Sequence, residues 1–263
     1  MSNKDDDVVQ LINAARDSGV LGTGTASSIT GNLGSLVIAG AAGKALEDIT
    51  ASEVTLFTVL IDASGSIAQR NLEVAVRAGQ HALNDALGAT RERDGILLAL
   101  WTFNNDLRVL HGYLPVNDAA RLDERSYRAV GGTRLYDAWC DALAANVAYA
   151  QRLRDGGTPC KSVVVVVTDG EDTSSSRTIS ECERLSRDVL ASELFTLAFV
   201  GLGDEASFEK VARGMGVPDG NVLVQKQATP QGLRKAFALV SRSAVRVSMG
   251  RVQAGPAVGF FSP

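Results

Sequence analysis

Three short segments of the sequence carry oxygen-bearing side chains of the kind that bind a hard metal ion. Asp62, Ser64 and Ser66 alternate within the first segment, Thr133 follows two glycines in the second, and Asp169 begins a turn in the third. Two carboxylates and three hydroxyls suit Mg²⁺ better than a Ca²⁺ cage built from many carboxylates. Zinc sites normally use His or Cys, and neither type occurs in these segments. The residue types therefore predict a Mg²⁺ site, with Mn²⁺ or Ca²⁺ as alternatives.

The three segments adjoin stretches that have the patterns of regular secondary structure. Near-continuous apolar runs rich in β-branched residues, as in strands buried on both faces, occupy residues 54–61, 96–103, 163–167 and 194–200. Helical patterns lie between them, and a short strand at 222–224 and a long helix over 233–247 complete the alternation. This alternation predicts an α/β fold with a doubly wound, mostly parallel six-stranded sheet and helices on both faces. Residues 107–114 are expected to form one antiparallel strand on the edge side of the sheet.

The predicted sheet explains how residues far apart in the sequence come to share one site. In open α/β sheets, ligands bind beyond the carboxyl ends of the strands, where the strand order reverses. Asp62 and Asp169 each follow an apolar run directly, and Thr133 precedes a predicted helix. Singly, each segment has a plainer interpretation as a helix cap or a tight turn. Together, at the ends of strands in one sheet, they predict a single metal site.

The five residues together resemble the metal-ion-dependent adhesion site (MIDAS) of von Willebrand factor A (vWA) domains. All five positions of that motif are matched in the family's order, by Asp62, Ser64, Ser66, Thr133 and Asp169. The resemblance covers about residues 52 to 248. It implies that Ser64 and Ser66 ligate the metal directly, and that Thr133 does so directly or through water. It also implies that Asp62 and Asp169 mostly hold coordinated waters.

The resemblance also implies a function. In the family, the open coordination position of the metal takes a Glu or Asp carboxylate from a partner protein, which is recognition and not catalysis. The stretch from Thr168 to Ser174 and the last helix look like those of intracellular bacterial members linked to tellurium resistance and stress systems. Other members serve AAA+ ATPases of the MoxR or chelatase type as partners.

Composition and charge favour a globular protein with an added N-terminal segment. The 263 residues are 45% hydrophobic and 21% charged, and the net charge of 26 − 30 = −4 is too small to drive binding to nucleic acid or anionic membranes. We expect residues 1–50 to form an N-terminal extension, with a short helix capped by Asp7 and then a flexible or irregular Gly/Ser/Thr-rich arm. Residues 51–248 are the expected vWA domain, and residues 249–263 are a C-terminal tail.

Cysteine usage and the N-terminus favour the cytoplasm. The three cysteines are odd in number and form no C-x-x-C pair, which argues for a reducing compartment and against structural disulfides. Of these, Cys160 is expected to be the most exposed. The N-terminus is acidic where a signal peptide would be basic, and the apolar stretch around residues 35–46 is short and broken by glycines. We expect neither secretion nor a membrane span.

A second binding mode stays open at the C-terminal end. Five basic side chains lie on or just past the last predicted helix with no acidic residue among them, namely Arg234, Lys235, Arg242, Arg246 and Arg251. Three interpretations stay open for these side chains. They form a solvated helix face, they pair with the acidic N-terminal segment, or they bind an acidic partner or nucleic acid. In the binding case the metal site is only structural.

Enzymatic interpretations are weaker. A haloacid-dehalogenase phosphatase needs an acid two residues after its nucleophilic Asp, and Ser64 stands at that position. A dinucleotide site at Gly201 and Gly203 would bring Asp204 and Glu205 against the pyrophosphate. A serine hydrolase is not supported, because the sequence has two isolated histidines and no G-x-S-x-G. We therefore expect a protein that is not an enzyme.

Overall fold

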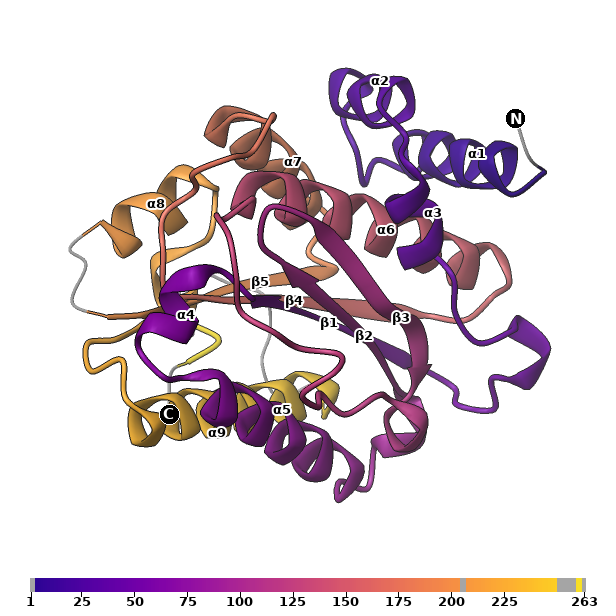
Figure 1. Cartoon of the computed structure of the whole chain (residues 1–263). Coiled ribbons are helices and arrows are strands. Elements are labelled where there is room, and N and C mark those ends of the chain that lie inside the picture. The colour runs from indigo at the N-terminus through magenta and orange to yellow at the C-terminus, as the bar shows by residue number, and fades with distance from the viewer. Residues whose placement is uncertain (1–2, 204–206, 250–258, 262–263) are drawn as a thin grey trace.

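The computed structural model of the chain, which describes residues 3–203, 207–249 and 259–261, is built around a six-stranded sheet (Figure 1). The strand order is β3-β2-β1-β4-β5-β6. The strands are β1 (Val54–Asp62), β2 (Ile96–Phe103), β3 (Leu107–Pro115), β4 (Cys160–Thr168), β5 (Phe195–Leu202) and β6 (Val222–Gln225). Among the strands of the described residues, only β2 and β3 pair antiparallel. The predicted mostly parallel sheet with one antiparallel strand on its edge side is therefore confirmed.

Helices cover both faces of the sheet (Figure 1). The helices of the α/β body are α4 (Gly65–Gln69), α5 (Glu73–Gly88), α6 (Leu135–Asp155), α7 (Ile179–Ala191), α8 (Phe208–Gly214) and α9 (Pro230–Ser248). One apolar core contains buried residues of α6, α7 and α8, and a second contains those of α4, α5 and α9. Because side chains alternate along a strand, β1 sends Leu56 and Leu60 into the first core and Phe57 and Val59 into the second.

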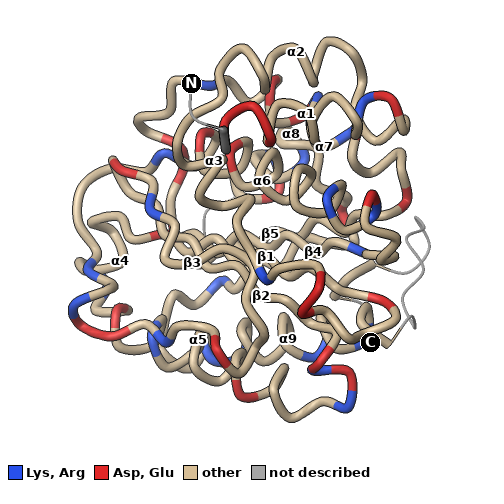
Figure 2. The backbone as a smooth tube through the Cα atoms, turned by 90° about the vertical axis from the view of Figure 1, so that its right-hand side faces the viewer, with Lys and Arg blue, Asp and Glu red and all other residues tan. Residues whose placement is uncertain are grey.

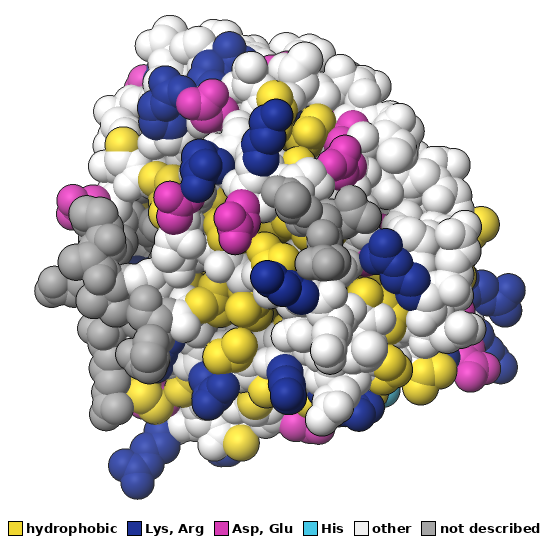
Figure 3. All heavy atoms as spheres, turned by 90° about the vertical axis from the view of Figure 1, so that its left-hand side faces the viewer, with side chains coloured by type: hydrophobic (Ala, Val, Ile, Leu, Met, Phe, Trp, Pro, Cys, Tyr) yellow, Lys and Arg dark blue, Asp and Glu magenta, His cyan; other side chains and the backbone are white. Residues whose placement is uncertain are grey.

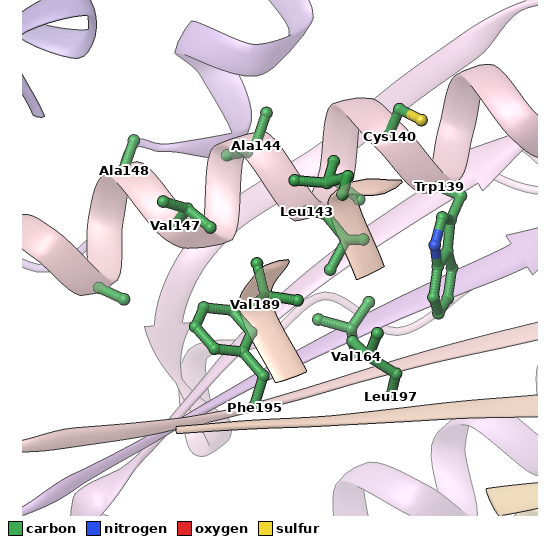
Figure 4. Packing of buried hydrophobic residues seen from close by; sticks show 14 of the residues in the cluster. Trp139, Cys140, Leu143, Ala144, Val147, Ala148, Val164, Val189, Phe195 and Leu197 are labelled. Carbon is green, nitrogen blue, oxygen red and sulfur yellow. The ribbon is translucent and has the colours of Figure 1, made fainter. Parts of the chain in front are cut away.

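In helix α6, the spacing of the apolar residues determines which side chains pack against the sheet. Trp139, Leu143 and Val147 recur every four residues, which places them on one face of the helix. Figure 4 shows these side chains directed toward the sheet, where Val164 of β4 and Leu197 of β5 lie. All five side chains are fully buried. This packing fixes the start of α6, and with it the segment that carries Thr133.

The N-terminal extension differs from the flexible or irregular arm that its composition predicts. Its described residues form three α-helices, which are α1 (Asn3–Asp17), α2 (Thr23–Gly31) and α3 (Ser35–Gly40). Asp7 lies inside α1 and forms an ion pair with Arg152 of α6, so it is not the helix cap expected from the sequence. Val8 and Ile12 of α1 belong to the same apolar core as α6. How the chain divides into domains stays a prediction.

Small residues allow the extension to approach the sheet closely. A Cβ atom on Gly40 would lie 2.0 Å from the Trp101 ring of β2. Just beyond α3, the Tyr113 amide donates to the Ala42 carbonyl at 2.8 Å, and the Lys44 amide donates to the Tyr113 carbonyl at 2.9 Å. These bonds cover part of the edge strand β3. Of the glycines that suggest a loose arm, Gly40 and Gly43 therefore serve close packing, since a Cβ on Gly43 would likewise lie 2.5 Å from the Tyr149 ring.

Two further expectations concern the surface. Within the ranges that the structure describes, no helix combines the length and apolar character needed to cross a membrane. Figure 2 shows basic and acidic residues mixed along the outer helices and loops. Cys160 is the most exposed of the three cysteines, as the sequence predicts, but all three are buried and the predicted loop position of Cys160 is wrong. The residue begins β4 and is only 5% exposed, because the strand starts earlier than its apolar run suggests.

Candidate metal centre

The five predicted residues come together at the carboxyl ends of β1 and β4. These strands are neighbours at the point where the strand order reverses. The Ser64 and Ser66 hydroxyls lie 3.0 Å apart, and Ser66 Oγ donates to Asp169 Oδ1 at 2.7 Å. Gly170 leaves room beside them, since a Cβ there would lie 3.6 Å from Thr133 Oγ1 and 3.8 Å from Ser66 Oγ.

Asp62 is held rigidly at the end of β1. Its Oδ1 accepts from the Ser64 amide at 2.7 Å, its Oδ2 accepts from Thr168 Oγ1 at 2.5 Å, and its carbonyl accepts from the Tyr127 hydroxyl at 2.6 Å. The residue is 1% exposed. Burial raises the pKa of Asp62 to about 6, against the lowering effect of the hydrogen bonds from Thr168 and Ser64. The site thus contains a buried carboxylate whose charge a cation would stabilise.

Asp169 is oriented by Arg70, a residue that the sequence analysis missed. Arg70 Nη1 donates to Asp169 Oδ2 at 3.2 Å, to the Asp169 carbonyl at 3.2 Å and to the Leu202 carbonyl at 3.1 Å. One guanidinium therefore links the ends of β4 and β5 to the segment after α4. Burial raises the pKa of Asp169, while the bond from Ser66 and the charge of Arg70 act in the opposite direction. No local sequence pattern marks Arg70 for this role.

The segment before Thr133 needs its two glycines. Gly131 has a φ of +81°, a conformation that side chains disfavour. A Cβ on Gly132 would lie 2.6 Å from Asn105 Oδ1 and 2.8 Å from Thr173 Oγ1. The same two atoms accept hydrogen bonds, from the Gly132 amide at 2.7 Å and the Thr133 amide at 2.8 Å. Asn105 and Thr173 therefore position Thr133.

The segment after β4 is attached to α6 by a buried carboxylate. Asp137 accepts from the Ser176 amide at 3.0 Å and from the Arg177 amide at 2.9 Å, and it pairs with Arg134 at 2.6 Å. Burial acts to raise the pKa of Asp137, but these bonds outweigh it and lower the pKa. Asp137 therefore fixes the segment that carries Asp169 against the helix that follows Thr133. Its place on a helical repeat gives no sign of this contact in the sequence.

The donor set suits a hard cation. Over the described part of the chain, no group of three or more His, Cys, Asp or Glu side chains is arranged to hold a metal. A metal at this end of the sheet would therefore depend on the hydroxyls of Ser64, Ser66 and Thr133 beside the two carboxylates. Oxygen donors of both kinds suit Mg²⁺ or Ca²⁺. Figure 3 looks onto this end of the molecule, where basic and acidic side chains stand together around apolar surface.

Comparison with protein families agrees with this architecture. A family model described as the von Willebrand factor type A domain matches residues 57–234, which include all five residues of the candidate centre. No curated protein matches the sequence significantly.

Solved structures of the same fold come from diverse organisms. One is a von Willebrand factor type A protein from Catenulispora acidiphila, with a TM-score of 0.51, 19% identity and coverage of 73% of this chain and 43% of that one. Another is the D319A mutant of the PilB minor pilin from Streptococcus sanguinis, with a TM-score of 0.56, 10% identity and coverage of 78% of this chain and 65% of that one. A third is proximal thread matrix protein 1 from the mussel byssus, with a zinc-occupied MIDAS motif. Its TM-score is 0.50 at 16% identity, and the match covers 73% of this chain and 46% of that one. The chain thus spans 43 to 65% of these structures, and at such identities the similarity concerns the fold.

Proposed function

The chain belongs to the von Willebrand factor type A domain family, and on this premise we propose that it recognises a partner protein through a divalent metal ion. Domains of this family generally mediate metal-dependent protein–protein interaction and are typically not enzymes. The observation that carries the proposal is the convergence of Asp62, Ser64, Ser66, Thr133 and Asp169 at one end of the sheet. We propose no catalytic role for any of them.

The division of roles that we propose among these residues is the one that the family resemblance implies. We assign Ser64 and Ser66 as direct ligands, with Thr133 binding directly or through water. Asp62 and Asp169, whose oxygens already accept hydrogen bonds within the protein, would mainly hold coordinated waters. A bound ion would then offer an open coordination position to a Glu or Asp carboxylate of the partner. Neutral hydroxyl ligands preserve most of the positive charge that attracts such a carboxylate.

The identity of the ion is part of the proposal. The oxygen donors favour Mg²⁺, with Mn²⁺ or Ca²⁺ as alternatives. The mussel byssus protein holds zinc in its MIDAS motif, so the absence of His and Cys from these segments does not exclude zinc. A titration of all four ions against the metal-free protein, with binding heat as the readout, ranks them directly.

The cellular setting is also proposed. We infer a cytoplasmic protein whose partner belongs to a tellurium-resistance or stress system, or is an AAA+ ATPase of the MoxR or chelatase type. Support comes from the resemblance of the segment from Thr168 to Ser174 to intracellular members of the family. We expect no binding to nucleic acid.

One observation favours a second candidate function. A groove of about 1000 Å³ lies between α5 and α9, and it is lined by apolar residues together with Arg242 and Arg246. Arg234, Lys235 and Arg242 of α9 are exposed. Arg251, the fifth basic residue of the predicted cluster, lies outside the described residues, as do Asp204 and Glu205. In this candidate function an acidic partner binds along α9 without help from the metal.

Affinity capture separates the two candidates. The wild-type chain is immobilised and exposed to partners in Mg²⁺ or in a chelator, beside Asp169→Ala, Arg242→Glu and the control Asp94→Asn. Asp94 is exposed and precedes β2, at the opposite end of the sheet. We expect partners that require Mg²⁺ and are lost with Asp169→Ala but kept by the control. Capture that survives the chelator and fails only with Arg242→Glu would contradict the metal-dependent proposal.

A further inference from the structure

Two cysteines that are far apart in the sequence meet in the core behind the candidate metal centre. Cys140 lies in the second turn of α6, and Cys182 lies in the first turn of α7. Their Sγ atoms are 3.6 Å apart, although the residues are 42 positions apart. Both thiols are free, and both residues are buried. A disulfide has an S–S length of about 2.05 Å, so small side-chain movements would join them.

The surroundings of the pair distinguish its two members. A hydrogen bond from Cys182 lowers the pKa of the Cys140 thiol, and the charge of Arg177 acts in the same direction. The same contact and burial raise the pKa of Cys182, whose Sγ also lies 3.7 Å from the Tyr136 carbonyl oxygen. Cys140 is therefore the better nucleophile, because the thiolate is the reactive form of cysteine.

A small cavity leads to Cys140. It has a volume of about 20 Å³ and lies between α2 and α7, where Cys140 and Arg177 line it together with Thr25 and Arg184. That volume is enough for about one water-sized molecule. The cavity thus brings water-sized molecules to Cys140, beside the side chains of Arg177 and Glu181.

The third cysteine has a different environment. The Cys160 thiol donates to the Ala150 carbonyl at 3.4 Å and lies 3.7 Å from Arg154 Nη1. Burial raises the pKa of Cys160. It therefore serves as an internal control for the reactivity of the pair.

We propose that Cys140 and Cys182 form a redox-active dithiol that a hydroperoxide converts to an intramolecular disulfide. In the first step the Cys140 thiolate attacks the peroxide, so that an S–O bond forms, the O–O bond breaks, and sulfenic acid and hydroxide result. In the second step Cys182 sulfur attacks Cys140 sulfur, so that the S–S bond forms, the S–O bond breaks, and hydroxide leaves with the Cys182 proton as water. With hydrogen peroxide, two thiols and one peroxide give one disulfide and two waters.

The position of the bond gives it a structural consequence. The chain between the two cysteines contains β4 and the segment with Asp169, and Asp137 already attaches that segment to α6. A disulfide would add a covalent link between α6 and the first turn of α7. Any effect on metal affinity rests on the proposed function, whereas the formation of the bond does not.

The test uses the reduced full chain and hydrogen peroxide, with thiols counted after denaturation. We expect a fall from three thiols to one, a linked peptide containing Cys140 and Cys182, and full recovery of thiols with dithiothreitol. Cys160→Ser should still lose two thiols at the same rate. The proposal is overturned if Cys160 oxidises as fast as the pair, or if Cys140 passes to sulfinic acid without the link. Because no metal is needed, the result is independent of the proposed metal site.

Variants assign the order of the steps. In Cys182→Ser, whose fold is checked by its melting temperature, oxidation should stop at sulfenic acid on Cys140, which dimedone traps when it is added together with denaturant. Arg177→Gln should slow the loss of thiols in the otherwise wild-type chain, whereas Arg184→Gln, on the same cavity, should not. Equal rates in the two arginine variants would contradict the role given to Arg177.

Discussion

Ser66 Oγ donates a 2.7 Å hydrogen bond to Asp169 Oδ1 across 103 positions of the sequence. The bond joins the segment after β1 to the segment after β4, and these strands pair in parallel from Val54 to Ile61. Pairing in this register brings both strand ends to the same edge of the sheet. The candidate site is thus a product of strand order, and its residues need no local contact in the sequence.

Mg²⁺ should stabilise the wild-type protein and not Asp62→Ala. A ligand that binds only the folded state adds about 2.7 kcal/mol of stability at one hundred times its dissociation constant. We expect a rise of several degrees in the melting temperature of the wild type, measured by calorimetry in Mg²⁺ against a chelator. Asp94→Asn should respond as the wild type does. An equal shift in Asp62→Ala would place the bound metal elsewhere.

Gly132→Ala should weaken metal binding while the fold persists. A Cβ at this position would lie 2.6 Å from Asn105 Oδ1 and 2.8 Å from Thr173 Oγ1, the two atoms that position Thr133. Disturbing such supporting contacts typically costs about 10- to 100-fold in metal affinity. Titration calorimetry measures the loss. Gly24→Ala is the matched control, because a Cβ there meets nothing within 4 Å, and a similar loss in this variant would contradict the interpretation.

The charge of Asp137 should stabilise the fold at neutral pH and lose this effect in acid. Its folded-state pKa is lowered, so its contribution is present above the unfolded pKa of about 3.9 and is lost as pH falls through the folded pKa. Asp137→Asn should therefore cost about 2 kcal/mol at pH 7, the scale of hydrogen bonds to a buried charge. Urea unfolding in a chelator at about pH 7 and pH 3 measures the difference, which should shrink at the lower pH. A cost independent of pH would show that the charge of Asp137 is not what stabilises the segment.

Ile12→Ala should destabilise the whole protein. Ile12 is fully buried in the core shared by α1 and α6. Removing such a side chain typically costs about 2–5 kcal/mol. An undocked N-terminal arm would tolerate the change, so the free energy of unfolding tests the position of α1 directly. Val74→Ala, at a position 69% exposed, should change it by less than about 0.5 kcal/mol.

The sequence alone was enough to predict the sheet and the residues expected at its edge. Buried parallel strands must be apolar throughout, so the runs that became β1, β2, β4 and β5 stand out from the polar segments that follow them. Asp62, Ser64 and Ser66 alternate within five consecutive residues, and Thr133 and Asp169 sit at recognisable ends of elements. Those local signals exist because the strand ends and the side chains beyond them are consecutive in the chain.

Tertiary structure decided the contacts that join distant segments. The glycines of residues 19–43 predict an irregular arm by local propensity, yet Gly40 is where the extension packs against Trp101. Arg70 reaches the carbonyl of Leu202, and Cys140 meets Cys182, only because β1, β4 and β5 are neighbours and α6 packs on α7. Residue type and spacing encode which segments form elements, whereas the partners of a long side chain depend on which elements the fold makes adjacent.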